Sequence, residues 1–548
     1  MKAAPPVVIG SELSLEDVER VARRQAEVQI GLEVPSRMEA SRAYVQQAVR
    51  TATDPQASPE RKRALSIYGV TTGFGSLKDR SLSSEEDAKA LQRNLLLSTA
   101  CGTGPPLPTE VVRAALLLRA QTLAAGYSGV RLELVERLAA LLNRRVHPIV
   151  PEQGSLGCSG DLCPLAHIAL VLLGHGEAEF QGQRWPAAEA LRRAGLESDD
   201  QPRFDISFKE GLALINGTTV TAGITALALL DAEEIARAAD VVAALSSEAL
   251  CARLRAFDPR LHRVRRHLWQ QRCAANLRRL WSGSTLLDRS AEVQDSYSIR
   301  CVPIVHGASR DAIAYVRQIV EHEINAVTDN PLVFVEDGEA VIDGRSEDRC
   351  FSGGNFHGQP LALAADFLAI AVAELADIAE RRCAKLLDHH HNGGLPPMLT
   401  PFPGLHSGLM IAQYTAAALV SENKVLCHPA SVDSIPTSAN AEDHNSMGMG
   451  AALKLRRVLD NAAGALAAEL LCAIQALDLR TGRIQGASTV HSEALPGAGT
   501  AAAWGAARGE VAMLVEDREL APDLAKAREL ILTGSLRRAA ESAVGALE

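Results

Sequence analysis

A short Gly- and Ser-rich stretch, GSLGCSGDLCPLAH from Gly154 to His167, contains residues whose types and spacing could do chemistry. At its centre stands Cys158-Ser159-Gly160. The Gly160 nitrogen has little steric cover, so a tight turn would let it attack the Cys158 carbonyl carbon. Loss of water from the ring and from the Ser159 side chain would leave an imidazolone with an exocyclic methylene, which is a strong electrophile. An ordinary loop that enters a helix is the simpler interpretation of the same residues.

Further polar segments interrupt an otherwise apolar pattern, namely YGVTTGFG, INGTT, VQDSYSIRC, SGGNFHG and IPTSANAEDH. They are too short to be linkers, and loops at helix ends are where functional side chains usually lie on a rigid scaffold. Each also has an ordinary interpretation: Tyr68 could pack beside a pliable turn, and Asn216 could cap a helix. Gln294, Tyr297 and Arg300 are spaced three apart, which would place them on one face of a helical turn.

Helices must position these segments. Hydrophobic residues make up 47% of the 548 residues and aromatic residues only 4%, a composition typical of a large helical bundle. Ser14–Asp17 resembles a capping box that opens a first helix. Apolar periodicity predicts helices at Thr109–Ala125, Leu132–Arg145, Leu162–Leu173, Leu361–His389, Met410–Val425 and Met447–Leu479.

We therefore expect an all-α protein, a large elongated helical bundle with an N-terminal loop-rich region that carries the reactive triplet. Residues 1–215 would form the mostly helical N-terminal region with this loop. Residues 216–548 would form the central and C-terminal long-helix bundle, continuous with it in one catalytic unit. The charged, Gly-containing segment Glu336–Arg349 is interpreted as a surface insertion.

Composition also excludes several classes of partner. The net charge is -10 and the charges are well mixed, so we expect neither nucleic acid nor an anionic membrane surface as a partner. Gly211–Leu230 lacks charges, but it contains Asn and Thr and is followed directly by acids, which favours a buried core helix over a membrane span. The N-terminus lacks the apolar core of a signal peptide. Ten scattered cysteines without a C-x-x-C pair favour reduced thiols in a cytoplasmic protein.

The stretch GSLGCSGDLCPLAHIALVLLGHGEA is similar to the signature of the aromatic amino-acid ammonia-lyases and aminomutases, the family that includes histidine, phenylalanine and tyrosine ammonia-lyases. The resemblance extends from about residue 60 to 450, and the other polar segments follow in the family's order. It implies an all-α, cytoplasmic homotetramer whose active sites combine loops from three subunits. It also implies a cofactor, methylidene-imidazolone (MIO), formed autocatalytically from Cys158-Ser159-Gly160.

The resemblance implies roles for individual residues. Tyr68 would remove a proton from the substrate Cβ, which at neutral pH requires nearby positive charge or hydrogen-bond donors. Arg300 would bind the substrate carboxylate through its planar guanidinium. Tyr297 would hydrogen-bond near the reacting centre, and Gln294 would help to hold it. Asn216 would lie beside the MIO ring and the carboxylate.

The substrate pocket is where this sequence departs from the family's pattern. The pair Ser98-Thr99 occupies the selectivity position, where histidine ammonia-lyases usually carry Ser-His, and Ala441 stands where Gln is usual. Phe356 would line the pocket, and Glu442 would pair with an imidazole or receive the amine. The smaller side chains at positions 99 and 441 would leave room for a different substrate side chain.

The expected function is therefore an MIO-dependent ammonia-lyase that acts on a small-molecule amino acid, histidine or a related imidazole compound. A phenylalanine or tyrosine ammonia-lyase, or an aromatic aminomutase, stays open because these enzymes use the same residues. A catalytically inactive helical scaffold is the non-enzyme alternative. The joint presence of Tyr68, Ser159, Gly160, Tyr297 and Arg300 argues against that scaffold.

Two further features have simple interpretations. His389-His390-His391 is interpreted as a solvated helix end rather than a metal site, because consecutive histidines cannot all face one ion and no partnered acid is evident. No metal is expected. Cys158 stands where the family usually has Ala, and its thiol does not enter the ring atoms, so ring closure should stay possible.

Overall fold

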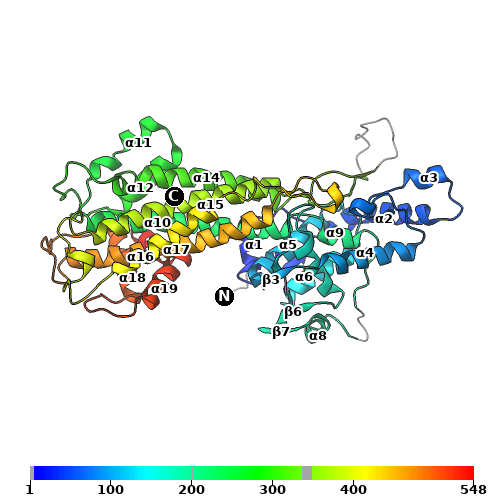
Figure 1. The fold of residues 1–548 in the computed structure, drawn as a ribbon, viewed down its shortest axis with the longest axis horizontal. Helices are drawn as coiled ribbons and strands as arrows, with labels where there is room; N and C mark the ends of the chain where they lie inside the picture. Colours follow the sequence, from blue (N-terminus) through cyan, green and yellow to red (C-terminus); the bar gives the residue numbers. More distant parts are fainter. Residues whose placement is uncertain (1–4, 199–202, 336–348) are drawn as a thin grey trace. The chain divides into compact units, whose positions relative to one another are not determined.

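The structure is a computed structural model that describes residues 5–198, 203–335 and 349–548. Helices dominate it (Figure 1), which confirms the predicted all-α class. The chain forms two compact units. Unit 1 comprises Met1–Leu227, Gln318–Ala365 and Pro429–Leu453, and unit 2 comprises Ala228–Arg317, Asp366–His428 and Lys454–Glu548. The expected division at residue 215 stays a prediction, and the expected surface insertion lies, apart from Arg349, outside the described residues.

Unit 1 contains short helices and several small sheets. Its helices are α1 (Leu15–Ala22), α2 (Val34–Thr53), α3 (Pro59–Ala64), η1 (Gly75–Leu77), α4 (Glu85–Thr99), α5 (Thr109–Ala124), α6 (Leu132–Asn143), α7 (Leu162–Leu172), α8 (Ala187–Arg193), α9 (Glu210–Ile215) and η4 (Ser438–Asn440). Its strands are β1 (Val7–Ile9), β2 (Val28–Ile30), β3 (Thr103–Pro106), β4 (His147–Pro148), β5 (Pro151–Gln153), β6 (Glu177–Phe180), β7 (Gln183–Pro186), β8 (Leu332–Val333) and β9 (Cys350–Phe351). Strands β1 and β2 pair in parallel, whereas β3–β5, β4–β6–β7 and β8–β9 are antiparallel.

Four long helices contribute residues to both units: α10 (Thr219–Ala249), α14 (Val302–Glu323), α15 (Gln359–Leu387) and α17 (Gly448–Arg480). The other helices of unit 2 are η2 (Leu254–Phe257), α11 (Pro259–Arg265), α12 (Leu268–Leu280), α13 (Tyr297–Arg300), η3 (Pro397–Leu399), α16 (Met410–Leu426), α18 (Ala498–Glu510), α19 (Ala521–Leu532) and α20 (Ser535–Val544).

The periodic segments form helices close to the expected bounds. The six predicted ranges correspond to α5, α6, α7, α15, α16 and α17, with differences of at most two residues at either end. The predicted capping box is also confirmed: Ser14 Oγ accepts from the Asp17 N–H at 3.1 Å, and Asp17 Oδ2 accepts from the Ser14 N–H at 3.2 Å. These features depend on local spacing, which is why the sequence predicts them well.

The uncharged segment Gly211–Leu230 is buried, but it is not the single helix that we expected. Helix α9 ends at Ile215 and α10 begins at Thr219. Between them Gly217 has φ +147°, a backbone conformation that a regular helix does not accommodate. Among the described residues, one helix, α17, is long and apolar enough to cross a membrane, and 94% of its apolar window is buried inside the protein.

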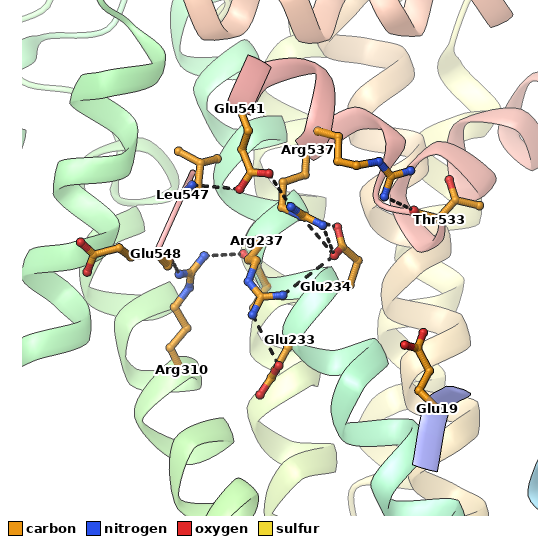
Figure 2. Close-up of polar contacts among 12 residues, drawn as sticks. Glu19, Glu233, Glu234, Arg237, Arg310, Thr533, Arg537, Glu541, Leu547 and Glu548 are labelled. Atoms are coloured by element: carbon orange, nitrogen blue, oxygen red, sulfur yellow. Dashed lines mark hydrogen bonds and ion pairs between the residues drawn. The ribbon is translucent and has the colours of Figure 1, made fainter. Parts of the chain in front are cut away.

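Buried charges connect the helices of unit 2. Glu469 on α17 accepts from the Arg382 guanidinium on α15 and from Ser246 Oγ on α10, the latter at 2.6 Å. Near the C-terminus, Arg537 on α20 donates to both carboxylate oxygens of Glu234 on α10 (Figure 2). The Glu469–Arg382 pair is fully buried, so breaking it would leave an uncompensated charge between α15 and α17, whereas the Arg537–Glu234 pair is only partly buried.

Candidate active site

The reactive triplet lies in a tight turn that continues into α7. Gly160 has φ +77°, and its backbone forms bridges to Cys158 and to Gly217. A Cβ atom added to Gly160 would lie 2.1 Å from the Gly217 carbonyl oxygen. Only glycine satisfies both the left-handed backbone and this close approach. Position 160 therefore requires glycine, the residue whose nitrogen has the least steric cover for ring closure.

The segment between α9 and α10 holds this turn by two backbone hydrogen bonds. The Gly217 N–H donates to the Ser159 carbonyl oxygen at 3.1 Å, and the Asp161 N–H donates to the Gly217 carbonyl oxygen at 2.7 Å. On another side, the Met447 N–H donates to the Leu156 carbonyl oxygen at 2.8 Å. The conformation of the triplet is thus determined by segments that are distant in sequence.

Asp161 anchors the turn to the start of α10. Its buried carboxylate accepts from the N–H groups of Val220 and Thr221 at 2.9 and 2.7 Å and from Thr221 Oγ1 at 2.6 Å. Negative charge is favoured at a helix N-terminus. Burial nevertheless outweighs these hydrogen bonds and raises the pKa of Asp161 to about 6. We did not identify Asp161 as a site residue from the sequence, although it directly follows the triplet.

Arg119 on α5 binds the backbone of Asn216, in the segment between α9 and α10. The fully buried guanidinium donates to the Asn216 carbonyl oxygen at 2.9 Å and to the Thr328 carbonyl oxygen at 3.2 Å. Burial lowers the pKa of Arg119 to about 10. Asn216 Oδ1 is buried and has no hydrogen-bond partner among the residues that the structure describes. Buried acceptors are normally paired, so this oxygen is available to a bound donor.

Tyr68 lies in the same unit, with its hydroxyl oxygen accepting from the Gly75 N–H at 3.0 Å. Its ring packs edge-to-face on Phe74, with the ring centroids 6.1 Å apart. Burial raises the pKa of Tyr68, the hydrogen bond from Gly75 lowers it, and the charge of Glu442 and the proximity of Cys158 raise it further. The Gly75 N–H is thus a donor of the kind that a tyrosine base requires.

Glu442 faces the triplet. Its Oε2 atom accepts from Thr437 Oγ1 at 2.8 Å, and the Cys158 thiol lies within hydrogen-bonding reach of the same carboxylate. Burial, followed by the charge of Glu442, raises the pKa of the Cys158 thiol to about 12. Cys158 is therefore a neutral hydrogen-bond donor near pH 7. The structure thus brings Tyr68, Cys158 and Glu442 together in unit 1.

The residues around the triplet fit an MIO ring. The left-handed Gly160 and the two hydrogen bonds around Gly217 impose a compact turn on the three residues that would cyclise. The buried oxygen of Asn216 can accept a hydrogen bond from a group bound beside that turn. A simple loop entering a helix does not require either feature.

The predicted pocket residues lie at the ends of two helices. Ser98 is exposed at the end of α4 and donates to the Leu95 carbonyl oxygen at 3.2 Å, while Thr99 is half-buried. Phe356 is half-buried just before α15. His357 beside it stacks on the His444 ring, with the centroids 5.7 Å apart.

The expected carboxylate-binding residues belong to unit 2. Helix α13 begins at Tyr297 after the extended Ser296, so Gln294 precedes the helix and is exposed. The prediction that all three residues share one helical turn is therefore wrong for Gln294, because the backbone becomes helical only after Ser296. The Arg300 guanidinium lies 4.6 Å from the centroid of the Tyr297 ring. Its buried Nε atom has no partner within the described part of the chain.

The histidine triplet at the end of α15 has the acidic partner that we did not find in the sequence. Asp388 Oδ2 lies 2.7 Å from His391 Nδ1, and Asp388 Oδ1 accepts from the His390 N–H at 3.0 Å. Hydrogen bonds with His391 and His390 lower the pKa of Asp388. The acid closes the turn that follows the helix, and His390 and His391 are exposed there.

Comparisons with known proteins agree with this geometry. The model of the aromatic amino acid lyase family matches residues 13–508. The chain is 51% identical to a histidine ammonia-lyase of Symbiobacterium thermophilum, with 99% of each chain covered. It is 50% identical to one of Sorangium cellulosum, with 99% of this chain and 100% of the relative covered.

Solved structures show the same similarity. The histidine ammonia-lyase of Trypanosoma cruzi superposes with a TM-score of 0.84 at 37% identity, covering 98% of this chain and 96% of that one. The tyrosine aminomutase of Streptomyces globisporus superposes with a TM-score of 0.87 at 35% identity, covering 99% and 100%. The chain therefore belongs to the aromatic amino acid lyase family.

Proposed function

We propose that this protein is an MIO-dependent ammonia-lyase that eliminates ammonia from histidine or a closely related imidazole amino acid. The observation that carries the proposal is the Cys158-Ser159-Gly160 turn, held by Gly217 on one side and facing Glu442 on the other. About 50% identity to histidine ammonia-lyases over nearly the whole chain supports histidine as the substrate.

Cys158, Ser159 and Gly160 would form the cofactor, and the segment from Asn216 to Thr218 would hold it. When formed, this group supplies an electrophile for the substrate amine, which leaves poorly by itself. Asn216 Oδ1, buried without a partner among the described residues, would accept a hydrogen bond from a group bound beside it. Arg119 keeps that segment in place through the Asn216 carbonyl oxygen.

Tyr68 would take the proton from the substrate Cβ at its hydroxyl oxygen. The Gly75 N–H, 3.0 Å from that oxygen, favours the phenolate form that accepts the proton. Burial of the ring excludes water and disfavours the same phenolate. The base is consequently strong once it is deprotonated, and activity should rise with pH.

Arg300 would bind the substrate carboxylate, with its orientation supported by the Tyr297 ring. Tyr297 is 70% exposed, so its hydroxyl is accessible to a bound molecule. Gln294 would support Tyr297 from the preceding loop. We propose that Tyr297 and Arg300 act on the substrate of a neighbouring subunit, since the family shares its active sites between subunits.

Exposed apolar side chains support a homotetramer. On α15, Phe367 and Ile370 are 45% and 42% exposed, and on α16 Ile411 and Tyr414 are 54% and 60% exposed. Neighbouring apolar side chains of this size are more often covered by another subunit than left in water. We further propose that the protein is cytoplasmic.

Glu442 would pair with the substrate imidazole, while Ser98, Thr99 and Phe356 would line the pocket. A carboxylate near the base would also repel the phenolate, so a cationic or polar ring beside Glu442 would relieve that repulsion. Ala441 and Thr99 are smaller than the residues usual in histidine ammonia-lyases. A related imidazole substrate with a bulkier side chain is therefore compatible with the same pocket.

An aromatic aminomutase is the second candidate. The similarity to a tyrosine aminomutase with a TM-score of 0.87 favours it. A lyase releases ammonia, whereas an aminomutase returns it to Cβ and yields a β-amino acid.

Two measurements test the proposal. The intact mass should be two waters lower than the mass of the translated chain. The Ser159→Ala variant should have the mass of its own translated sequence, without this deficit, and should release no ammonia. Histidine, tyrosine, phenylalanine and modified imidazole amino acids should then be assayed for ammonia, unsaturated acid and β-amino acid. Unreduced mass together with ammonia release by Ser159→Ala would contradict the MIO mechanism. No turnover of any substrate would favour the inactive scaffold.

A further inference from the structure

A small hairpin in unit 1 connects two residues with opposite influences on Tyr68. It runs from Thr437 to Glu442 and is closed by backbone hydrogen bonds of 2.9 and 3.3 Å between these two residues. Ser438, Ala439 and Asn440 within it have φ values of +52°, +52° and +65°. Three consecutive non-glycine residues in the left-handed region are unusual, and such strain tends to be retained where it serves a function.

One end of the hairpin positions an acid. Thr437 Oγ1 donates to Glu442 Oε2 at 2.8 Å, which orients the carboxylate relative to Cys158 and Tyr68. A carboxylate so close to the phenol disfavours the phenolate.

The other end contacts the loop that carries the donor to Tyr68. Ser438 Oγ accepts from the Ser76 N–H at 3.3 Å. Gly75 precedes Ser76 and has φ +52°, and a Cβ atom added to Gly75 would lie 2.5 Å from Ser438 Oγ. The hydroxyl of Ser438 therefore touches a backbone that only glycine allows to approach so closely.

That backbone is the one that supports the base. The Gly75 N–H donates to the Tyr68 hydroxyl oxygen at 3.0 Å. The Gly75 and Ser76 N–H groups are adjacent in one turn, and the first donates to Tyr68 while the second donates to Ser438. A hydrogen bond that fixes the Ser76 N–H therefore restricts the direction in which the Gly75 N–H points.

We propose that Ser438 is a positioning residue for the base: by accepting from Ser76, it holds the Gly75 N–H on the Tyr68 hydroxyl oxygen. This inference rests on the proposed role of Tyr68. Ser438 acts through the backbone of Gly75 and Ser76 and does not itself contact the reacting atoms. The strained hairpin thus supplies both the carboxylate that opposes the phenolate and the hydroxyl that supports it.

The groups around Tyr68 determine how much its pKa is raised, and the hydrogen bond from the Gly75 N–H opposes that rise. Burial, Glu442 and Cys158 each raise the pKa of Tyr68, and the Gly75 N–H lowers it. Loss of the Ser438 contact should therefore raise this pKa further, and should reduce the phenolate fraction about three- to tenfold at a given pH, as expected for weakening one hydrogen bond to a charged group.

The test uses Ser438→Ala and Ser438→Gly in the full-length protein, with Ser83→Ala, an exposed serine of the same unit, as the matched control. Ser438→Gly removes the hydroxyl but relieves the left-handed strain, so it should fold at least as well as the wild type. All six tyrosines are replaced by fluorotyrosine, because a ring fluorine lowers phenol pKa values into a convenient range. Ultraviolet difference spectra against Tyr68→Phe then report the phenolate at position 68.

Both Ser438 variants should titrate position 68 at higher pH than the wild type and the Ser83→Ala control. The rising limb of kcat/KM should move to higher pH by the same amount, with KM nearly unchanged. An unchanged titration, or an equal loss of kcat/KM at every pH, would overturn the proposal. The titration needs no turnover, so it tests the role of Ser438 even if the proposed lyase activity fails.

Discussion

Two polar clusters, a buried one in unit 2 and a partly buried one in unit 1, contain groups with perturbed pKa values, yet they differ in how completely their carboxylates are paired. In unit 2, Asp240 on α10 accepts from four donors: His306 Nδ1 at 2.8 Å, Cys273 Sγ at 3.1 Å, Asn276 Nδ2 at 3.0 Å and an Arg310 nitrogen at 2.8 Å. Despite full burial, Arg310 and His306 lower the pKa of Asp240 to about 2.

In unit 1 the corresponding groups have too few partners. Tyr68 and Cys158 have raised pKa values, and the hydroxyl of Tyr68 accepts from the Gly75 backbone. Asn216 Oδ1 has no partner in the described chain. The backbone around them is left-handed at Gly160 and at Ser438.

The difference teaches that a perturbed pKa does not by itself identify a catalytic group. Within the described residues, His306 Nε2 is a buried atom of the unit 2 cluster without a partner, but the carboxylate at its centre is saturated. A saturated carboxylate stabilises the packing of α10, α12 and α14. The unit 1 cluster is distinguished by its left-handed backbone, and its unpaired Asn216 Oδ1 leaves it able to bind a donor.

The largest expected effect on activity comes from replacing Tyr68 in the unit 1 cluster. We expect Tyr68→Phe to lower kcat about 100- to 10,000-fold, because it removes the proposed general base. The mass deficit of two waters and the unfolding temperature should stay close to those of the wild type. Ammonia release, intact mass and thermal unfolding check this. An activity near that of the wild type would exclude Tyr68 as the base.

Asp240→Asn should give the opposite result. Removing this charge takes away the buried carboxylate that Arg310 and His306 share, so the free energy of unfolding should fall by about 3–5 kcal/mol. Activity per folded molecule should be retained. Denaturant unfolding and active-site titration measure the two quantities. Asp460→Asn, which removes an exposed ion pair with Arg528, is the control and should cost at most about 1 kcal/mol.

Glu442→Gln should have an intermediate effect, confined to unit 1. If Glu442 pairs with the substrate as proposed, losing its charge should lower kcat/KM for histidine about 10- to 100-fold, as for a hydrogen bond to a charged group. Because the Glu442 charge raises the pKa of Tyr68, the rising limb of the pH profile should also move to lower pH. Asp443→Asn, at the exposed neighbouring position, should change neither quantity. Equal losses in both variants would mean that Glu442 acts only through loop structure.

The last prediction concerns a pH dependence of stability that both units share, with a small effect per pH unit. Burial lowers the pKa of His306 in unit 2, and burial followed by Arg113 and Arg145 lowers that of His147 in unit 1 to about 4. An unfolded histidine titrates near about pH 6.5, so between this pH and about 4 the unfolded chain binds protons that the folded chain does not. Stability should therefore be complete above about pH 6.5 and fall as the pH decreases, by at most about 1.4 kcal/mol per pH unit for each histidine.

Denaturant unfolding at several pH values measures this slope. His147→Gln should flatten it, whereas His175→Gln, which replaces an exposed histidine of the same unit, should not. An identical slope in the wild type and His147→Gln would assign the acid sensitivity to other groups.

Local patterns predicted much of this molecule correctly. The Ser14 capping box and helices α5, α6, α7, α15, α16 and α17 depend on spacing within a few turns of chain, and the structure confirms them. The Cys158-Ser159-Gly160 chemistry is equally local, because the three residues that would cyclise are adjacent. The two errors also concern short segments of chain. The helical turn predicted to include Gln294 begins only after Ser296, and Asp388 is the acidic partner of the histidine triplet that the sequence pattern did not indicate.

The sequence by itself determined the helical class, the triplet and the family, because each is encoded in composition or in short contiguous motifs. Tertiary structure alone decided what surrounds the triplet. Glu442 and Ser438 lie near Tyr68 and its loop although more than 360 residues separate them in the sequence. Only the folded structure shows that Asp161 and Arg119 anchor the segments around the triplet. Hydrogen bonds and desolvation act over a few ångströms in space regardless of separation along the chain, and it is they that determine which of the polar residues in this sequence become reactive.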